Sequence, residues 1–184
     1  MTGRTQRRER GAAAVEAVIV TPIFILLVIG IMEFALFFQN NLSASDAVKA
    51  GVRMASAEGR NANFAQDAAD RVETAGGALN KNNIQQLWVY KANTTDEFPQ
   101  GFSSFSDCTV CVKFAWDGTR FTPTLNSWAA TSQNACASGP PDRIGVYLQV
   151  RHDALTRMVF STITIREANV LGIEPIPASN GCRP

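Results

Sequence analysis

Residues 11–38 form an almost unbroken apolar run with the sequence GAAAVEAVIVTPIFILLVIGIMEFALFF. Between Ala17 and Met32 no residue is charged, and Thr21 is the only polar side chain. A helix needs about twenty apolar residues to cross the hydrocarbon core of a bilayer. The pattern therefore predicts a membrane-spanning helix over about residues 17–38.

The helical pattern does not stop where the apolar run ends. Small and apolar residues recur at helical spacing as far as Ala57, and Gly59 offers a place for the helix to end. Small side chains let another element approach a helix closely. We therefore predict one helix over residues 12–58, whose second half packs against a globular head domain. The predicted contact stripe consists of Ala44, Val48, Gly51, Val52 and Ala55, with Ala47, Ala50 and Met54 beside it.

A second, shorter helix is predicted at the start of the head domain. Asn61 or Asn63 can cap this helix, and Gly76-Gly77 can end it. Asp67 and Arg71 are spaced for an ion pair on its surface. The stripe expected to face the core consists of Phe64, Ala68, Val72 and Ala75.

Alternating apolar and polar residues predict four strands in the rest of the head domain. We expect these strands to form an antiparallel sheet that packs on the second half of the long helix. Residues 122–141 are interpreted as a long polar loop, and Asp153–Phe160 as a short helix between the last two strands. Residues 59–184 are therefore assigned to an α+β head domain. The predicted strands are Gln86–Lys91, Thr109–Trp116, Arg143–His152 and Ser161–Ala168.

Positive charge is concentrated at the start of the chain. Residues 1–11 hold four arginines against one glutamate, whereas residues 12–184 carry a net charge of −2. By the positive-inside rule the basic leader stays in the cytoplasm and everything after Phe38 lies outside. A nucleic-acid-binding protein would need a basic patch on the folded domain. We therefore expect a single-pass protein with its N-terminus in the cytoplasm and no nucleic-acid partner.

Glu16 is the residue of the apolar run that most needs an explanation. A carboxylate near hydrocarbon costs at least ~2.5 kcal/mol and usually marks a function. A cleavable signal peptide does not explain it, because the apolar run is too long and Glu16 interrupts it. A plain membrane anchor, with Glu16 reaching back to the cytoplasmic interface, is the simpler alternative.

Several motifs of the long helix occur in an order known from one family. They are R-G-A-A-A-V-E at 10–16, Pro22 in the apolar run, G-I-M-E-F-A at 30–35 and A-G-V-R-M-A at 50–55. This series resembles the TadE-like proteins of tight-adherence (Flp-type) pilus systems, within the type IV pilin and pseudopilin class. In that family a prepilin peptidase cuts after the glycine that stands five residues before the glutamate.

Carried over to this chain, the cut falls between Gly11 and Ala12. The free ammonium of Ala12 would then lie one helical turn from Glu16. Opposite charges offset part of each other's desolvation cost in a low dielectric. In a filament, the ammonium of one subunit could meet Glu16 of a neighbour and set the axial register.

The resemblance implies a structural protein, a minor pilin or pseudopilin, and no enzyme. Such a chain is inserted in the bacterial cytoplasmic membrane, trimmed, and recruited through its helix into a pilus used in cell adhesion, or into the assembly platform. The implied partners are a prepilin peptidase, platform proteins, an assembly ATPase acting through that platform, and other pilins. The alternative is a membrane-anchored extracytoplasmic binding or adhesion module with an uncut leader.

Two further residues of the helix are candidates for a role in assembly. Glu33 would lie about 31 Å from Ala12 at ~1.5 Å per residue, and so at the outer membrane boundary. The family tends to have a glutamate there, but we interpret Glu33 as a solvated boundary residue. Pro22 removes one helical hydrogen bond and loosens the helix, which would help subunits to pack in a filament.

All four cysteines lie beyond the membrane segment, in an oxidising compartment, and are expected to form structural disulfides. These cysteines are Cys108, Cys111, Cys136 and Cys182, and three pairings are open. Cys108 and Cys111 also have the spacing of a redox dithiol, but Cys111 falls in a strand pattern and not at a helix start. A zinc site would have to recruit Cys136, Cys182 or His152. We expect no metal and no cofactor.

No catalytic motif is recognisable, so we expect no catalytic residue and no small-molecule substrate. His152 is the only histidine and is interpreted as a surface residue at a strand end. Met32, Met54 and Met158 are interpreted as packing residues. Residues 174–179, EPIPAS, are expected to form an extended tail that closes over the domain.

Overall fold

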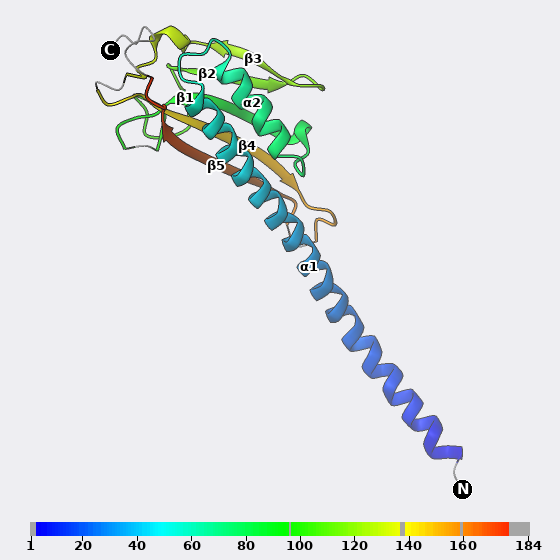
Figure 1. Ribbon diagram of the computed structural model, residues 1–184. Helices are drawn as coiled ribbons and strands as arrows, with labels where there is room; N and C mark the ends of the chain where they lie inside the picture. Colours follow the sequence, from blue (N-terminus) through cyan, green and yellow to red (C-terminus); the bar gives the residue numbers. More distant parts are fainter. Residues whose placement is uncertain (1–2, 96, 137–138, 159, 177–184) are drawn as a thin grey trace.

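The computed structural model describes residues 3–95, 97–136, 139–158 and 160–176, with the backbone alone for residues 3–12. Figure 1 shows a long helix that joins a head domain at one end and projects away from it at the other. The elements are α1 (Gly3–Ala57), α2 (Phe64–Ala75), η1 (Lys81–Asn83), β1 (Ile84–Lys91), β2 (Cys111–Trp116), β3 (Phe121–Asn126), η2 (Ala130–Ser132), β4 (Arg143–Asp153) and β5 (Thr162–Gly172).

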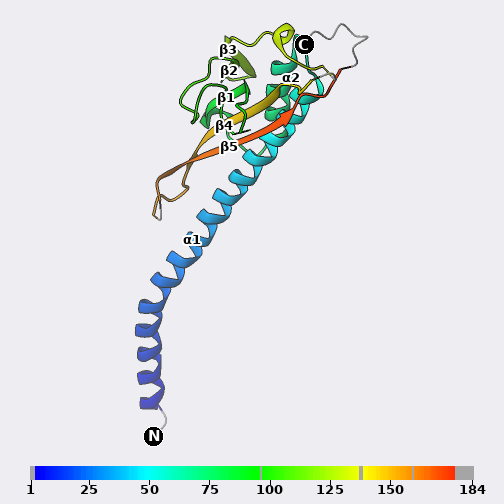
Figure 2. The same cartoon turned by 90° about the vertical axis from the view of Figure 1, so that its left-hand side faces the viewer.

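The head domain is built on a five-stranded antiparallel sheet with the strand order β3-β2-β1-β4-β5. Both helices lie on one face of this sheet (Figures 1 and 2). α1 packs on β4 and β5, whereas α2 packs on β1 and β3. A long apolar helix followed by a small antiparallel sheet and a short helix confirms the predicted α+β class.

The second half of α1 is buried through the predicted stripe of small residues. It approaches α2 closely at Gly51, where an added Cβ would lie 2.4 Å from Cγ2 of Val72. At the end of α1, Oγ of Ser56 donates a 2.6 Å hydrogen bond to the carbonyl of Gly172 on β5. The stripe residues that are at most 1% exposed are Ala44, Ala47, Val48, Val52 and Ala55.

The turn after α1 differs in one detail from the expectation. The left-handed residue of this turn is Arg60, with φ of 67°, and not Gly59. Gly59 serves close packing instead, because a Cβ there would lie 2.2 Å from Cγ2 of Ile173. The Arg60 backbone N–H and guanidinium donate to the side-chain and main-chain oxygens of Gln133, at 2.7 and 2.9 Å. These bonds tie the end of α1 to the segment that precedes β4.

Both faces of the sheet are covered, which the alternation in β1 shows directly. Leu87 and Val89 face the core under the helices, whereas Trp88 and Tyr90 belong to a second cluster on the other face. The connection between β1 and β2, residues 92–110, covers this second cluster. Its Phe105 stacks on Tyr147 of β4 with a ring separation of 4.0 Å. The connection is therefore part of the packed structure.

α2 is found where it was predicted, but its surface interactions differ. The side chain of Asn63 makes no capping hydrogen bond, and Asn61 Oδ1 accepts from the backbone N–H of Asn63 at 3.0 Å. Among the ion pairs of the described residues, none joins Asp67 to Arg71. Asn63 thus occupies the predicted N-cap position without a side-chain capping bond, the predicted ion pair was wrong, and α2 is held by its buried apolar face.

The predicted polar loop over residues 122–141 was wrong in its first part, which forms β3. Phe121 is the buried residue of this strand, and the residues from Pro123 to Asn126 are exposed. β3 is an edge strand, where a proline is tolerated because one side of the strand has no partner. An edge strand with one core residue lacks the alternation by which the other strands were recognised.

The predicted helix over residues 153–160 was also wrong. β4 continues to Asp153, and Arg157 has φ of 57°, which interrupts any right-handed helix. The backbone N–H of Ala154 donates to the carbonyl of Ser161 at 3.0 Å, which closes the β4–β5 hairpin. We call residues 155–158 the hairpin tip.

The chain after β5 follows the expected extended course as far as it is described. The N–H of Glu174 donates to the carbonyl of Ser56, and that of Ile176 donates to the carbonyl of Ala135. Residues 177–179 of the predicted tail lie outside the described residues. Through the bond to Ser56, the segment after β5 helps to hold the end of α1 on the sheet.

We expect Gly51→Ala to lower the free energy of unfolding by about 1–3 kcal/mol, because it overpacks the contact between α1 and α2. Urea unfolding of the full chain in detergent micelles, followed by tryptophan fluorescence, would measure the change. The matched control is Gly172→Ala, since an added Cβ there meets no atom within 4 Å. Equal stability of the two variants would contradict the close approach at Gly51.

Candidate functional site: the exposed half of α1

The N-terminal half of α1 stands alone and exposes its apolar side chains. From Ala13 to Val28 every residue is exposed, and burial by the head begins only near Glu33. By length and composition the described part of α1 could cross a membrane, and it is the only such helix among the described residues. An apolar surface of this size marks contact with lipid or with other proteins. The largest exposed side chains include Val18, Ile19, Ile23, Phe24, Leu27 and Ile31.

The residues predicted for processing and assembly all lie on this projecting part. Gly11 and Ala12 have helical backbone within α1, so the predicted cleavage position is not a structural boundary. Glu16 is exposed and forms no hydrogen bond or ion pair with any described residue. The carboxylate of Glu16 is thus available to a group outside this chain.

Pro22 is the only proline in the described part of α1, and the helix has a shallow hollow beside it. The hollow is wide open to the outside, and its surface is almost wholly apolar. Figure 2 shows α1 bending in its N-terminal part. A proline removes one helical hydrogen bond and is the usual cause of such a bend. The lining residues are Ala17, Val18, Thr21, Pro22, Ile25 and Leu26.

Glu33 is not the solvated boundary residue that was predicted. It is only 1% exposed, because the hairpin tip covers it. Its two carboxylate oxygens accept hydrogen bonds from the backbone N–H groups of Leu155 (3.1 Å) and Thr156 (2.5 Å), and from the Thr156 hydroxyl (2.7 Å). These bonds join positions 122 and 123 residues apart in the chain. We call this arrangement the Glu33 clamp.

The contact between α1 and the hairpin continues one turn further along the helix. His152 is 5% exposed and not on the surface as predicted, and its Nδ1 lies 2.7 Å from the side-chain amide of Asn40. Phe37 packs edge-on against His152 and against Phe160, with ring separations of 5.8 and 6.4 Å. Aromatic packing and hydrogen bonds therefore fix the hairpin to α1 together.

Sequence reasoning missed the Glu33 clamp because the acceptor and the donors are far apart in the chain. The donors are backbone groups, which leave no trace in residue identity. A weak signal was present: a glutamate beside an apolar run is costly unless hydrogen bonds satisfy it. Glu33, like Glu16, stands in such a run, so its carboxylate could have been expected to need hydrogen-bond donors.

The methionines also differ from the expectation. Met158 is 59% exposed at the hairpin tip and Met32 is 53% exposed on α1, so neither packs in the head core. Met54 is half-buried beside the contact stripe. The two exposed methionines add to the apolar surface near Glu33.

Cys108 and Cys111 form a disulfide with each other. Both are buried in the cluster behind the sheet, where they close the connection between β1 and β2. Cys136 is also disulfide-bonded, and Cys182 lies outside the described residues. Among the described residues, no group of His, Cys, Asp and Glu side chains is arranged to hold a metal ion.

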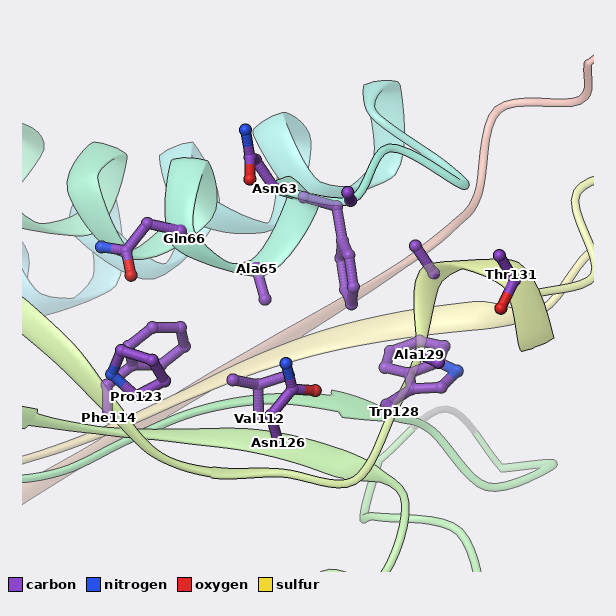
Figure 3. A pocket seen from close by; sticks show the side chains of 13 residues that line it. Asn63, Ala65, Gln66, Val112, Phe114, Pro123, Asn126, Trp128, Ala129 and Thr131 are labelled. Atoms are coloured by element: carbon purple, nitrogen blue, oxygen red, sulfur yellow. The ribbon is translucent and has the colours of Figure 1, made fainter.

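A pocket of about 470 Å³ lies between α2 and the strands β2 and β3 (Figure 3). Asn63, which precedes α2, and Gln66 of α2 lie on one side of it, and Pro123 and Asn126 of β3 on the other. The polar side-chain groups among its lining residues are amides, the Trp128 indole N–H and the Thr131 hydroxyl. No acid, base or thiol lines this pocket, so it has no group suited to proton transfer.

A match to a known protein family falls on α1. Residues 11–53 match the model of the TadE-like protein family. The resemblance to TadE-like proteins is thereby confirmed over these residues, which lie entirely on α1 and span both its projecting and its packed half. No curated protein and no solved structure gave a significant match to the chain.

Loss of the carboxylate in Glu33→Ala should free the hairpin tip from the TadE-like helix. A hydrogen bond to a charged group contributes about 1.5–3 kcal/mol, so amide hydrogen exchange at Leu155 and Thr156 should be at least tenfold faster. Hydrogen exchange of the full chain, read by mass spectrometry, measures this directly. Glu16→Ala is the matched control, because Glu16 is exposed and should leave both amides protected. Unchanged exchange in Glu33→Ala would show that the aromatic packing alone holds the tip.

Proposed function

We propose that this protein is a minor pilin or pseudopilin of a tight-adherence pilus, and that it works as a structural subunit. The observation that carries the proposal is the exposed apolar half of α1, which lies within the segment that matches TadE-like proteins. An exposed apolar helix needs either a bilayer or neighbouring helices around it. A pilin-like subunit uses both environments in turn, first the membrane and then the fibre.

The proposal divides the chain into a leader of residues 1–11, a helix of residues 12–58 and a head of residues 59–184. The membrane segment, predicted from the sequence over about residues 17–38, is proposed instead to run from Ala13 to Met32, because the head already covers Glu33. These residues measure about 30 Å at ~1.5 Å per residue, which matches the hydrocarbon core of a bilayer. The basic leader places the N-terminus in the cytoplasm and the head outside.

Processing would give the Glu16 carboxylate a partner. A prepilin peptidase would cut between Gly11 and Ala12 and leave an ammonium one helical turn from Glu16. In the assembled fibre, the ammonium of one subunit would pair with Glu16 of the next. The hollow beside Pro22 would receive apolar side chains of a neighbouring helix.

The partners proposed are the peptidase, the inner-membrane platform with its assembly ATPase, and other pilins. No catalytic role is proposed, and the pocket between α2 and the sheet offers no acid, base or thiol for one. The head would face the periplasm before assembly and the fibre surface afterwards. A part in cell adhesion follows from the pilus system and is assigned to no particular residue.

Mass spectrometry of the protein purified from membranes tests the proposal. We expect a mature chain that begins at Ala12 when the protein is produced together with its prepilin peptidase. The same protein produced without the peptidase is the control and should keep the leader. An intact leader in both preparations would instead favour an uncut membrane-anchored binding module.

Glu16→Ala should block incorporation into sheared pili while leaving membrane insertion unchanged. Breaking a buried ion pair costs about 3–5 kcal/mol, so incorporation should fall at least tenfold. The measurement is the ratio of this protein in the pilus fraction to that in the membrane fraction. Glu16→Asp keeps the charge and should retain part of the incorporation. Normal incorporation of Glu16→Ala would refute the role in register.

A further inference from the structure

The hairpin tip between β4 and β5 presents apolar side chains to the outside. Leu155 is 71% exposed and Met158 is 59% exposed. On the described head surface only Leu125, at 41%, is a comparable exposed apolar residue, and it lies on β3 at the opposite edge of the sheet. The exposed apolar residues of the head are thus concentrated where the hairpin meets α1.

The position of the tip along α1 is fixed by the Glu33 clamp. Glu33 follows directly after Met32, and the apolar residues Phe34, Leu36 and Phe38 beyond it are still exposed on the side of α1 that the hairpin leaves open. The tip therefore lies at the same height as the end of the proposed membrane segment. In Figures 1 and 2 the β4–β5 hairpin extends from the head toward the projecting part of α1.

The clamp also makes the tip suited to a place with little water. A backbone N–H without a partner is costly in a bilayer. The N–H groups of Leu155 and Thr156 and the Thr156 hydroxyl are all satisfied by Glu33. Leu155 and Met158 can therefore enter an apolar environment while these three donors keep their hydrogen bonds.

The charge at the tip favours a lipid surface. Arg157 is exposed, and no described acidic residue forms an ion pair with it. The nearby carboxylates are already engaged, since Glu33 binds the tip and Asp153 pairs with Arg151 at 3.2 Å. A guanidinium is well matched to a phosphate group. Apolar side chains can enter the boundary region of a bilayer while a neighbouring guanidinium stays at the level of the headgroups.

We propose that the hairpin tip is a membrane-docking element. Leu155 and Met158 enter the headgroup region of the outer leaflet, and Arg157 binds a lipid phosphate. The head is then attached to the bilayer at two points, the helix and the tip, and has a fixed tilt before assembly. This inference rests on the proposed membrane segment of α1, but not on cleavage or on a pilus.

Tryptophan quenching in proteoliposomes tests the proposal with the full chain. Met158→Trp and, separately, Leu155→Trp would be reconstituted in phosphatidylcholine and phosphatidylglycerol vesicles brominated near the headgroup end of the acyl chains. We expect most of the added emission to be quenched in both variants. Leu125→Trp is the matched control and should lose little of its added emission. The wild type gives the background of the native tryptophans, of which Trp88 and Trp128 are buried.

Two results would overturn the proposal. The first is unquenched, red-shifted emission at positions 155 and 158, which would place the tip in water. The second is unquenched but blue-shifted emission, which would place it against another protein. Resistance of the same vesicles to alkaline carbonate extraction shows whether α1 is inserted. Failure of the docking element is thus distinguishable from failure of the membrane segment.

Discussion

The Glu33 clamp is the interaction on which the relation between the helix and the head depends. It lies near the place where the head begins to cover α1, and it joins a buried carboxylate to backbone groups of the hairpin. A buried carboxylate is tolerable only when hydrogen bonds satisfy it. The hairpin tip supplies these bonds, and the carboxylate in turn orders a tip that has no helix or sheet of its own. Each partner stabilises the other.

The clamp lies where α1 passes from its projecting half to the half that the head covers. Beyond Glu33 the helix is buried through small residues such as Ala47 and Ala55, which allow α2 and the sheet to approach closely. Before Glu33 the side chains are mostly large, apolar and exposed, and Phe34, Leu36 and Phe38 continue this exposed apolar surface on the face of α1 that the head does not cover. Small residues would leave a membrane segment weakly apolar, and large ones would keep α2 away from α1. The change in side-chain size along one continuous helix therefore reflects the change in its surroundings.

Much of the fold could be predicted because its signals are local. The helix, its contact stripe and the strands other than β3 follow from periodicity within a few residues. β3 was missed because an edge strand with one core residue has no alternation. The hairpin tip was misread as a helix because its conformation depends on Glu33, far away in the chain. His152 was misplaced for the same reason, since its burial comes from Phe37 and Asn40 on α1.

The continuity of α1 has a consequence for any assembly of this chain. The match to TadE-like proteins covers residues 11–53, so it includes both the projecting half and much of the packed half. The packed half cannot turn about its axis without moving the head, because its stripe is fully buried against α2, β4 and β5. A neighbour that fixes the rotation of the projecting half therefore also fixes which face of the head points outward. The clamp adds to this coupling at the point where the helix leaves the head. A contact made with the projecting half of this one continuous helix would therefore act on the orientation of the head as well.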